Sequence, residues 1–485
     1  MGPLCPFFLI TAKIHLNIYM TWKTFYNSVR GERWPAYVPE SDFESLPDYV
    51  KEECKHFGYT PGEFKLQSSI EQKVFPIKSA TACQLKWTWS TLFLSTGKTA
   101  SCHRTTQHTF DTTTFNFHNT PMKINDRERM INGQWPNTGC NYCKNIEDAG
   151  GQSDRITNLD YPGIHAPVEL DSNPIATEVT PRILEVYFDN LCNLKCLYCG
   201  PHFSSLWDAE NTKHGPFLKN GLQLPGKFIK DAQFSENKVK FFSWFKEHGH
   251  NVTRFNILGG EPFYQSEFDD CLEFFSNNAY PDLDVEAFSN LHIPHKHLVK
   301  QINKIKKLVD SNLIKNFKIT ASIDCWGPQQ EFVRYPLDLV NWEENFNYIL
   351  NTTTIPLVIG STITPLTVKT LPNLIEKINE WNKVRPVYHY FNSVNGPSYM
   401  MIDILGDVFT EDFNRALDLM PDGNADQLQI KDYMRGIAQQ SAYGGKNDVE
   451  CIKLLTFLDE IDRRRNANWR TLFPWLADML SKYNT

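Results

Sequence analysis

The stretch Cys192-Asn193-Leu194-Lys195-Cys196-Leu197-Tyr198-Cys199 directly follows the apolar run Ile-Leu-Glu-Val-Tyr-Phe at 183–188. The run has the length and composition of a buried strand, so the three thiols lie on a loop at its end. Such a loop can hold a metal centre from one side and leave a coordination position open for chemistry. The alternatives are a three-Cys zinc site without a nearby His, or unligated thiols, but closed structural zinc sites need four ligands.

Composition limits the compartment and the partners. The chain has 485 residues and a net charge of −7, which argues against a nucleic-acid binder that works through a basic face. The 12 Cys include two dense groups, a distribution that suits metal binding in a reducing cytosol better than a secreted disulfide framework. No apolar run approaches the length of a membrane span. We therefore expect a cytoplasmic protein with no membrane segment and no nucleic-acid partner.

Beyond a Gly-, Asp- and Pro-rich linker at about 150–178, apolar runs alternate with segments of helical spacing. Alternating strands and helices predict a parallel sheet and an α/β fold. Aromatic residues at 241–245 and 272–275 mark two of the intervening helices. The expected strands are Ile183 to Phe188, Val252 to Leu258, Val285 to Phe288, Lys318 to Ile323, Ile355 to Ile363, and Val387 to Phe391.

Candidate site residues come directly after three of these runs. In a parallel α/β barrel, chemistry takes place at the C-terminal ends of the strands, so the residues that follow each strand are the ones to inspect. Arg is suited to such a site because its planar fork can grip a carboxylate by two hydrogen bonds. The residues are Gly259-Gly260-Glu261-Pro262 after the second run, Ser289 and Asn290 after the third, Ser322 and Asp324 at the end of the fourth, and Arg334 ten residues after Asp324.

Each of these groups also has a purely structural interpretation. The glycine pair fits a turn, and Ser289 with Asn290 fits a plain strand end. Asp324 and Arg334 fit a surface ion pair, and Cys325 fits a small buried hydrophobic residue.

A second group of thiols precedes the sheet. The segment from Cys83 to Cys102 contains aromatic and β-branched residues and a turn at Gly97, so we expect a β-hairpin with a thiol at each end. Cys140 and Cys143 add a C-x2-C pair after a turn-prone segment. Four Cys in two pairs can hold either a zinc ion or an iron-sulfur cluster.

The C-x3-C-x2-C loop with Tyr198 before its last Cys, the GGEP tetrapeptide at 259–262 and the S-x-D at 322–324 resemble the radical S-adenosylmethionine (SAM) superfamily. The resemblance implies a partial (βα)6 TIM-type barrel over about 175–400. It also implies a four-iron, four-sulfur cluster on Cys192, Cys196 and Cys199, whose fourth iron binds SAM. The residues that match the family's SAM site are Tyr198, Gly259, Gly260, Glu261, Pro262, Ser289, Asn290, Ser322, Asp324 and Arg334.

The pattern C-x13-G-x4-C followed by C-x2-C resembles the twitch domain, a shortened relative of the SPASM domain. The resemblance implies that Cys83, Cys102, Cys140 and Cys143 ligate an auxiliary four-iron, four-sulfur cluster in a domain at about 71–160. In this chain the segment precedes the core, whereas in the family it usually follows it. A Pro-interrupted N-terminal extension over 1–70 completes this half of the chain.

Beyond about 400 the strands stop, and helices are expected over 401–485, including an amphipathic stretch from Val449 to Asp462. Arg463, Arg464 and Arg465 fit a solvated helix end, and the aromatic residues at 469–475 suggest that the tail packs back on the core. We expect a radical SAM enzyme that acts on a peptide or a small molecule and receives electrons from a flavodoxin or ferredoxin. The alternative is a non-catalytic zinc-binding protein.

Overall fold

The computed structural model describes residues 79, 81–148, 153–157, 178–423 and 425–483. The N-terminal extension and most of the 150–178 linker lie outside these residues. The chain divides into two compact units, and each is treated by itself. Unit 1 runs up to Leu92 and continues through Gly97–Glu185 and Asn251–Arg254. Unit 2 comprises Phe93–Thr96, Val186–His250 and Phe255–Thr485.

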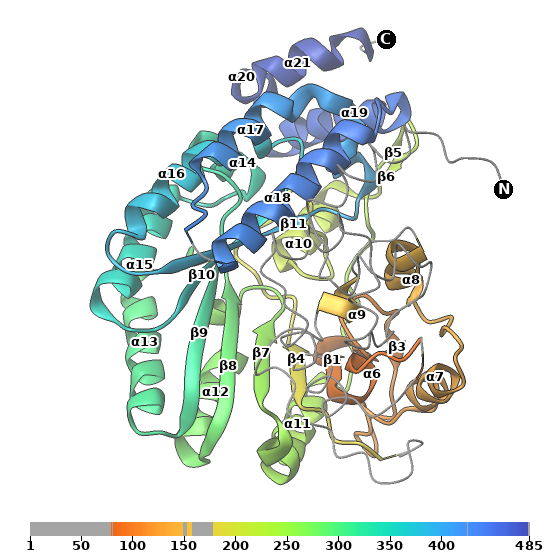
Figure 1. The fold of residues 1–485 in the computed structure, drawn as a ribbon, viewed down its shortest axis with the longest axis vertical. Coiled ribbons are helices and arrows are strands. Elements are labelled where there is room, and N and C mark those ends of the chain that lie inside the picture. The colour runs from red at the N-terminus through yellow and green to blue at the C-terminus, as the bar shows by residue number, and fades with distance from the viewer. Residues whose placement is uncertain (1–78, 80, 149–152, 158–177, 424, 484–485) are drawn as a thin grey trace, which may run out of the picture. The chain divides into compact units, whose positions relative to one another are not determined.

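A parallel sheet forms the centre of unit 2 (Figure 1). The strands lie side by side in the order β11-β10-β9-β8-β7-β4, of which β4 up to Glu185 and the first residue of β7, Arg254, are counted in unit 1. The β8–β9, β9–β10 and β10–β11 pairs are parallel, which confirms the α/β class and all six expected strands. The bounds are β4 Ile183–Tyr187, β7 Arg254–Leu258, β8 Tyr280–Ser289, β9 Ile314–Ser322, β10 Leu357–Ile363 and β11 Val387–Ser393.

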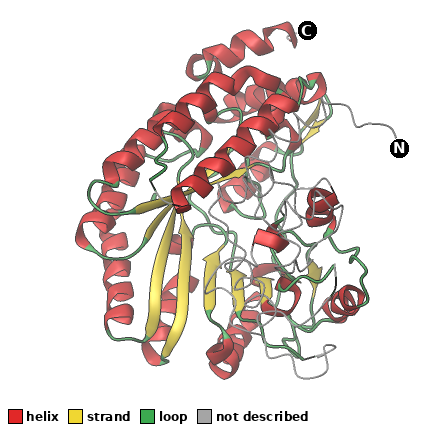
Figure 2. Ribbon diagram, viewed as in Figure 1, coloured by secondary structure: helices red, strands yellow, loops and turns green. Residues whose placement is uncertain are grey.

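At least one helix separates each strand of this sheet from the next (Figure 2). The helices bury apolar faces: Phe241 and Phe245 of α11 and Phe275 of α12 are buried, as their spacing predicts. A two-stranded hairpin, β5 Leu218–Lys219 with β6 Leu222–Gln223, also belongs to this unit. The helices are α10 Ser205–His214, α11 Phe234–His248, α12 Ser266–Asn277, α13 His295–Asp310, α14 Pro328–Val333, α15 Leu339–Thr352 and α16 Leu371–Trp381.

The C-terminal region is helical, as expected. Trp469 and Phe473 are buried, and the ring of Phe473 lies 5.5 Å from that of Phe332, so the tail packs on the core. The prediction of a solvated arginine run was wrong for two of its members: the side chains of Arg464 and Arg465 are 1% and 2% exposed, because Glu460 and Glu210 bind them. The helices are α17 Thr410–Leu419, α18 Ala425–Tyr443, α19 Asp448–Arg465, α20 Trp469–Leu472 and α21 Pro474–Leu480.

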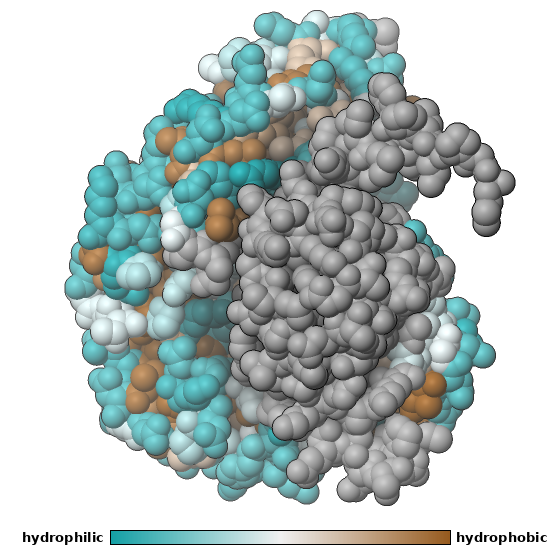
Figure 3. Space-filling model, in the orientation of Figure 1, coloured by the Kyte–Doolittle hydropathy of each residue, from teal (hydrophilic) through white to brown (hydrophobic). Residues whose placement is uncertain are grey.

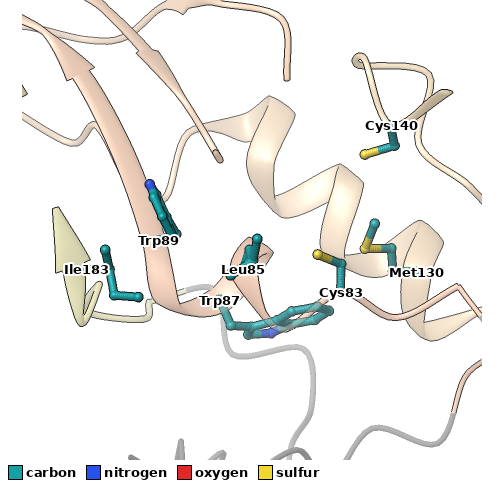
Figure 4. Packing of buried hydrophobic residues seen from close by; sticks show 7 residues of the cluster. All are labelled: Cys83, Leu85, Trp87, Trp89, Met130, Cys140 and Ile183. Carbon is teal, nitrogen blue, oxygen red and sulfur yellow. The ribbon is translucent and has the colours of Figure 1, made fainter. Parts of the chain in front are cut away.

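Unit 1 is built on a short sheet and small helices around an apolar cluster (Figure 4). Strand β1 lies beside β2, and β2 pairs antiparallel with β3. The predicted hairpin is therefore present, but its first strand starts after Thr88 and not at Cys83. Leu85–Thr88 form a helical turn instead, closed by a hydrogen bond from the Thr88 hydroxyl to the Gln84 carbonyl. The elements are α6 Leu85–Thr88, β1 Trp89–Phe93, β2 Lys98–Ala100, β3 His108–Thr109, α7 Pro121–Ile131, α8 Asn141–Asp148 and α9 Asp154–Thr157.

On the face seen in Figure 3, the described residues are mainly hydrophilic, with hydrophobic side chains among the polar ones. Within the described ranges, the helices are too short or too polar to cross a membrane.

Candidate functional site

The loop that carries Cys192, Cys196 and Cys199 follows β4 and is fixed by backbone bonds. The amide of Lys195 donates to the Tyr335 carbonyl (2.7 Å), and the amide of Leu197 donates to the Val333 carbonyl (2.8 Å). Cys192 and Cys196 are buried, Cys199 is half-buried, and all three are free thiols. The loop is therefore held by the end of α14 and by the residues that follow this helix, as well as by its own strand.

The three thiols act on one another electrostatically. Burial raises the pKa of Cys192, and the charges of Cys196, Glu261 and Cys199 add to the effect. Burial also raises the pKa of Cys199 to about 12, with a further contribution from Cys196. Thiols with raised pKa values become thiolates when a metal coordinates them, because the cation supplies the missing positive charge.

No three His, Cys, Asp or Glu side chains in the described ranges are placed to hold a single metal ion. A tetrahedral zinc ion with bonds of about 2.3 Å needs sulfurs in close contact. A four-iron cluster binds each thiolate at a different iron and so accepts a wider spacing.

Two glycines let the Gly259–Pro262 segment approach the cysteine loop. Gly260 has φ +49°, and a Cβ there would lie 2.1 Å from the Leu191 carbonyl oxygen, so only glycine fits. The Glu261 amide donates to that same oxygen at 2.9 Å. The Gln265 side-chain amide donates to the Leu191 and Asp189 carbonyls. Gln265 was missed by the sequence analysis, since nothing in the sequence distinguishes it from an ordinary residue at the start of a helix.

Glu261 is fully buried and is the meeting point of β7 and β8. Its carboxylate accepts hydrogen bonds from the Ser289 hydroxyl (2.7 Å), the Asn290 amide (2.5 Å) and the Phe263 amide (3.1 Å). Burial raises the pKa of Glu261 to about 7, and the bonds from Asn290, Ser289 and Phe263 oppose the rise. The structure thus brings together the residues predicted after β7 and after β8, because the Ser289 hydroxyl and the Asn290 backbone amide both donate to Glu261.

This raised pKa makes stability depend on pH. The ordinary pKa is 4.5 and the folded value is about 7, so the folded state favours protonated Glu261. The contribution of protonated Glu261 to the free energy of unfolding is complete below about pH 4.5 and is lost as the pH rises through 7. We expect the parent to lose unfolding free energy relative to E261Q between pH 5.5 and 7, by up to about 1.4 kcal/mol per pH unit. Urea denaturation of both proteins across this range measures the difference.

The control for this experiment is E247Q, since the Glu247 side chain is 77% exposed. Its pH profile is expected to follow that of the parent. Equal slopes for the parent and E261Q would contradict the assignment of a raised pKa to Glu261.

Asp324 and Arg334 form a buried pair rather than a surface pair. Arg334 donates from Nε and Nη2 to the two carboxylate oxygens, both at 2.8 Å. Asp324 also accepts from the Tyr198 hydroxyl (2.7 Å) and the Thr362 amide (2.8 Å). Burial raises the pKa of Tyr198, so its hydroxyl stays protonated and donates. Tyr198 thus ties the cysteine loop to the residues that follow β9, and Ser322 is the half-buried last residue of that strand.

Cys325 is fully buried and its thiol donates to the Gln330 side-chain oxygen. This agrees with the interpretation as a small buried hydrophobic residue.

In unit 1 the four thiols line one pocket of about 420 Å³, part of it open to solvent. Burial raises the pKa of Cys83, and the charges of Cys102, Cys140 and Cys143 contribute to the rise. Figure 4 shows Cys83 and Cys140 in the same apolar cluster as Met130 of α7. The sequence pairs Cys83–Cys102 and Cys140–Cys143 therefore lie around a common space.

Positive side chains share the lining of this pocket. Lys86, Arg104 and Arg155 line it together with one carboxylate, Asp154. Lys86 is buried and paired with Asp126. Cations beside four thiols favour the thiolate form that a metal centre requires. The sequence analysis missed Lys86, although a lysine between apolar residues was an available signal.

Comparisons with known proteins give little similarity. No protein-family model matches the sequence, and no curated protein matches it. Among solved structures, the chain is similar to "Native anSMEcpe with bound AdoMet and Kp18Cys peptide", with 16% identity and a TM-score of 0.31. The match covers 49% of this chain and 58% of that chain, so this chain spans little more than half of its length.

Proposed function

We propose that this protein is a radical SAM enzyme that abstracts a hydrogen atom from a peptide or a small-molecule substrate. The observation that carries the proposal is the meeting of three strand ends at the cysteine loop. Glu261 binds the backbone just before Cys192, at Leu191, and Asp324 binds Tyr198 just before Cys199. The Asn290 side chain lies 3.9 Å from the Cys192 sulfur. A three-thiol loop surrounded by buried acceptors and a buried guanidinium suits a cluster with a zwitterionic ligand.

Each side chain has a definite task in this proposal. Cys192, Cys196 and Cys199 would hold a four-iron cluster, which would supply one electron for the reductive cleavage of SAM to methionine and a 5'-deoxyadenosyl radical. Glu261 accepts hydrogen bonds from the amino group of SAM and is kept in position by its three donors. Arg334, oriented by Asp324, binds the carboxylate or the ribose of SAM. The segment Gly259–Pro262, Ser289, Asn290, Tyr198 and Ser322 complete the SAM site.

The four thiols of unit 1 bind the auxiliary cluster in this proposal. Because all four are cysteines, that centre is fully ligated by protein and acts as an electron carrier rather than as a substrate site. The cations that line its pocket support thiolate ligation. A flavodoxin or ferredoxin is the expected source of electrons.

Metal content tests the proposal directly. Anaerobic reconstitution with iron and sulfide is expected to give a brown protein with about eight iron atoms per chain, because seven thiols form one three-ligand and one four-ligand set. Dithionite reduction in the presence of SAM is then expected to yield 5'-deoxyadenosine. Stoichiometric zinc without iron uptake would instead support the non-catalytic zinc-binding alternative and refute both cluster assignments.

A further inference from the structure

The last residue of α19, Arg465, is a buried cation more than 250 positions away from the cysteine loop in the sequence. Its side chain is 2% exposed. Nε and Nη2 donate to the Glu210 carboxylate at 3.2 and 3.3 Å, and the buried Nη1 has no hydrogen-bond partner among the residues that the structure describes. The guanidinium lies over two aromatic rings, 4.8 Å from the centre of Trp207 and 5.3 Å from that of Tyr335.

Each group that contacts Arg465 also binds the cysteine loop. The Trp207 indole donates to the Cys196 carbonyl at 2.8 Å. The Tyr335 carbonyl accepts from the Lys195 amide. Glu210 accepts from the Lys195 ammonium group as well as from Arg465. Through Arg465, helix α19 therefore fixes Lys195 and Cys196 by way of three groups, Trp207, Tyr335 and Glu210.

The charges of Arg465, Lys195 and Glu210 do not balance. Glu210, whose side chain is 3% exposed, is one carboxylate shared by two cations, Lys195 and Arg465. Burying a net positive charge costs free energy unless an anion lies nearby. The Trp207 ring under Arg465 also binds the Cys196 carbonyl, so the nearby group that becomes negative when it ligates a metal is the Cys196 thiol.

We propose that Arg465 is a positioning residue that anchors the cysteine loop and supplies a buried positive charge that raises the reduction potential of the cluster on Cys192, Cys196 and Cys199. The inference rests on the proposed function. Reduction by one electron from a flavodoxin-type or ferredoxin-type donor adds one negative charge to this centre. A fixed cation in a low-dielectric site stabilises the reduced form more than the oxidised form.

The test is a redox titration of the reconstituted full chain, monitored by the electron paramagnetic resonance signal that changes on addition of SAM. R465Q removes the cation, and we expect the equilibrium constant for reduction to fall at least tenfold, which is about 59 mV for one electron. E210Q removes the shared anion and is expected to shift the potential in the opposite direction. R463Q is the matched control, because the Arg463 side chain is 58% exposed on the same helix turn, and its potential is expected to equal that of the parent.

Opposite shifts in R465Q and E210Q identify an electrostatic effect, since a disturbed loop would move both in the same direction. Shifts of equal sign, or an unchanged potential in R465Q with intact iron, overturn the inference. If R465Q loses the cluster, R465K is the variant to titrate, because it keeps the positive charge. Its reduction potential is expected to stay near that of the parent. A tenfold change in its equilibrium constant for reduction overturns the inference. If the parent protein lacks the SAM-responsive signal, the proposed function itself is refuted. This outcome is therefore distinct from a failure of the inference about Arg465.

Discussion

Replacing Cys196 by Ala is expected to abolish reductive cleavage of SAM and to leave the N-terminal thiol set with its iron. Cys196 is buried, and its carbonyl accepts a hydrogen bond from Trp207. Two remaining thiols cannot hold a cluster that needs three. The N-terminal thiol set lies entirely within unit 1 and consists of Cys83, Cys102, Cys140 and Cys143. Cys196 lies within unit 2, so its replacement should not remove iron from the N-terminal set.

The measurements for C196A are iron content and 5'-deoxyadenosine. Iron is expected to fall from about eight to about four atoms per chain, and 5'-deoxyadenosine to the background of the assay. C271A is the matched control, because Cys271 is a buried thiol of α12 outside both sets, and it is expected to retain full iron and activity. Complete loss of iron in C196A would show that the two sets are not independent.

Replacing Cys140 and Cys143 together by Ala is expected to separate SAM cleavage from substrate turnover. With four thiolate ligands, the auxiliary cluster has no iron free for substrate and can only support the fold or carry an electron. Its loss should therefore leave the first electron transfer and 5'-deoxyadenosine formation largely intact. Product formation should stop, because the electron left on the substrate radical has no exit.

Chromatography of 5'-deoxyadenosine from dithionite-reduced protein gives the result, after circular dichroism has established equal folding of variant and parent. K144A is the control for local disturbance of α8, since Lys144 directly follows Cys143 in this helix and forms a half-exposed ion pair with Asp148. Loss of 5'-deoxyadenosine in a well-folded double variant would mean that the N-terminal cluster supplies electrons to the SAM site, the reverse of the direction proposed here.

The sequence predicted the strands well because the burial of a strand is visible in the composition of its own residues. Parallel strands covered on both faces are nearly continuous apolar runs, and all six runs became strands, with β8 and β9 extending beyond the predicted bounds. The helical turn at Leu85–Thr88 was missed since aromatic and β-branched residues favour strands by propensity, whereas tertiary packing buries this segment as a helix. A segment this short is decided by its surroundings.

By itself, the sequence determined the alternating α/β order, the two thiol sets and the polar residues at the strand ends, since each depends on spacing along a few neighbouring residues. The tertiary structure alone decided which charges are buried and what they bind. Arg465 and Glu210 are 255 positions apart, and Lys86 and Asp126 are 40 apart. A charged residue at a helix end is usually solvated, so local pattern assigns it to the surface. Only the fold brings a carboxylate, two aromatic rings and a cysteine loop to the same arginine.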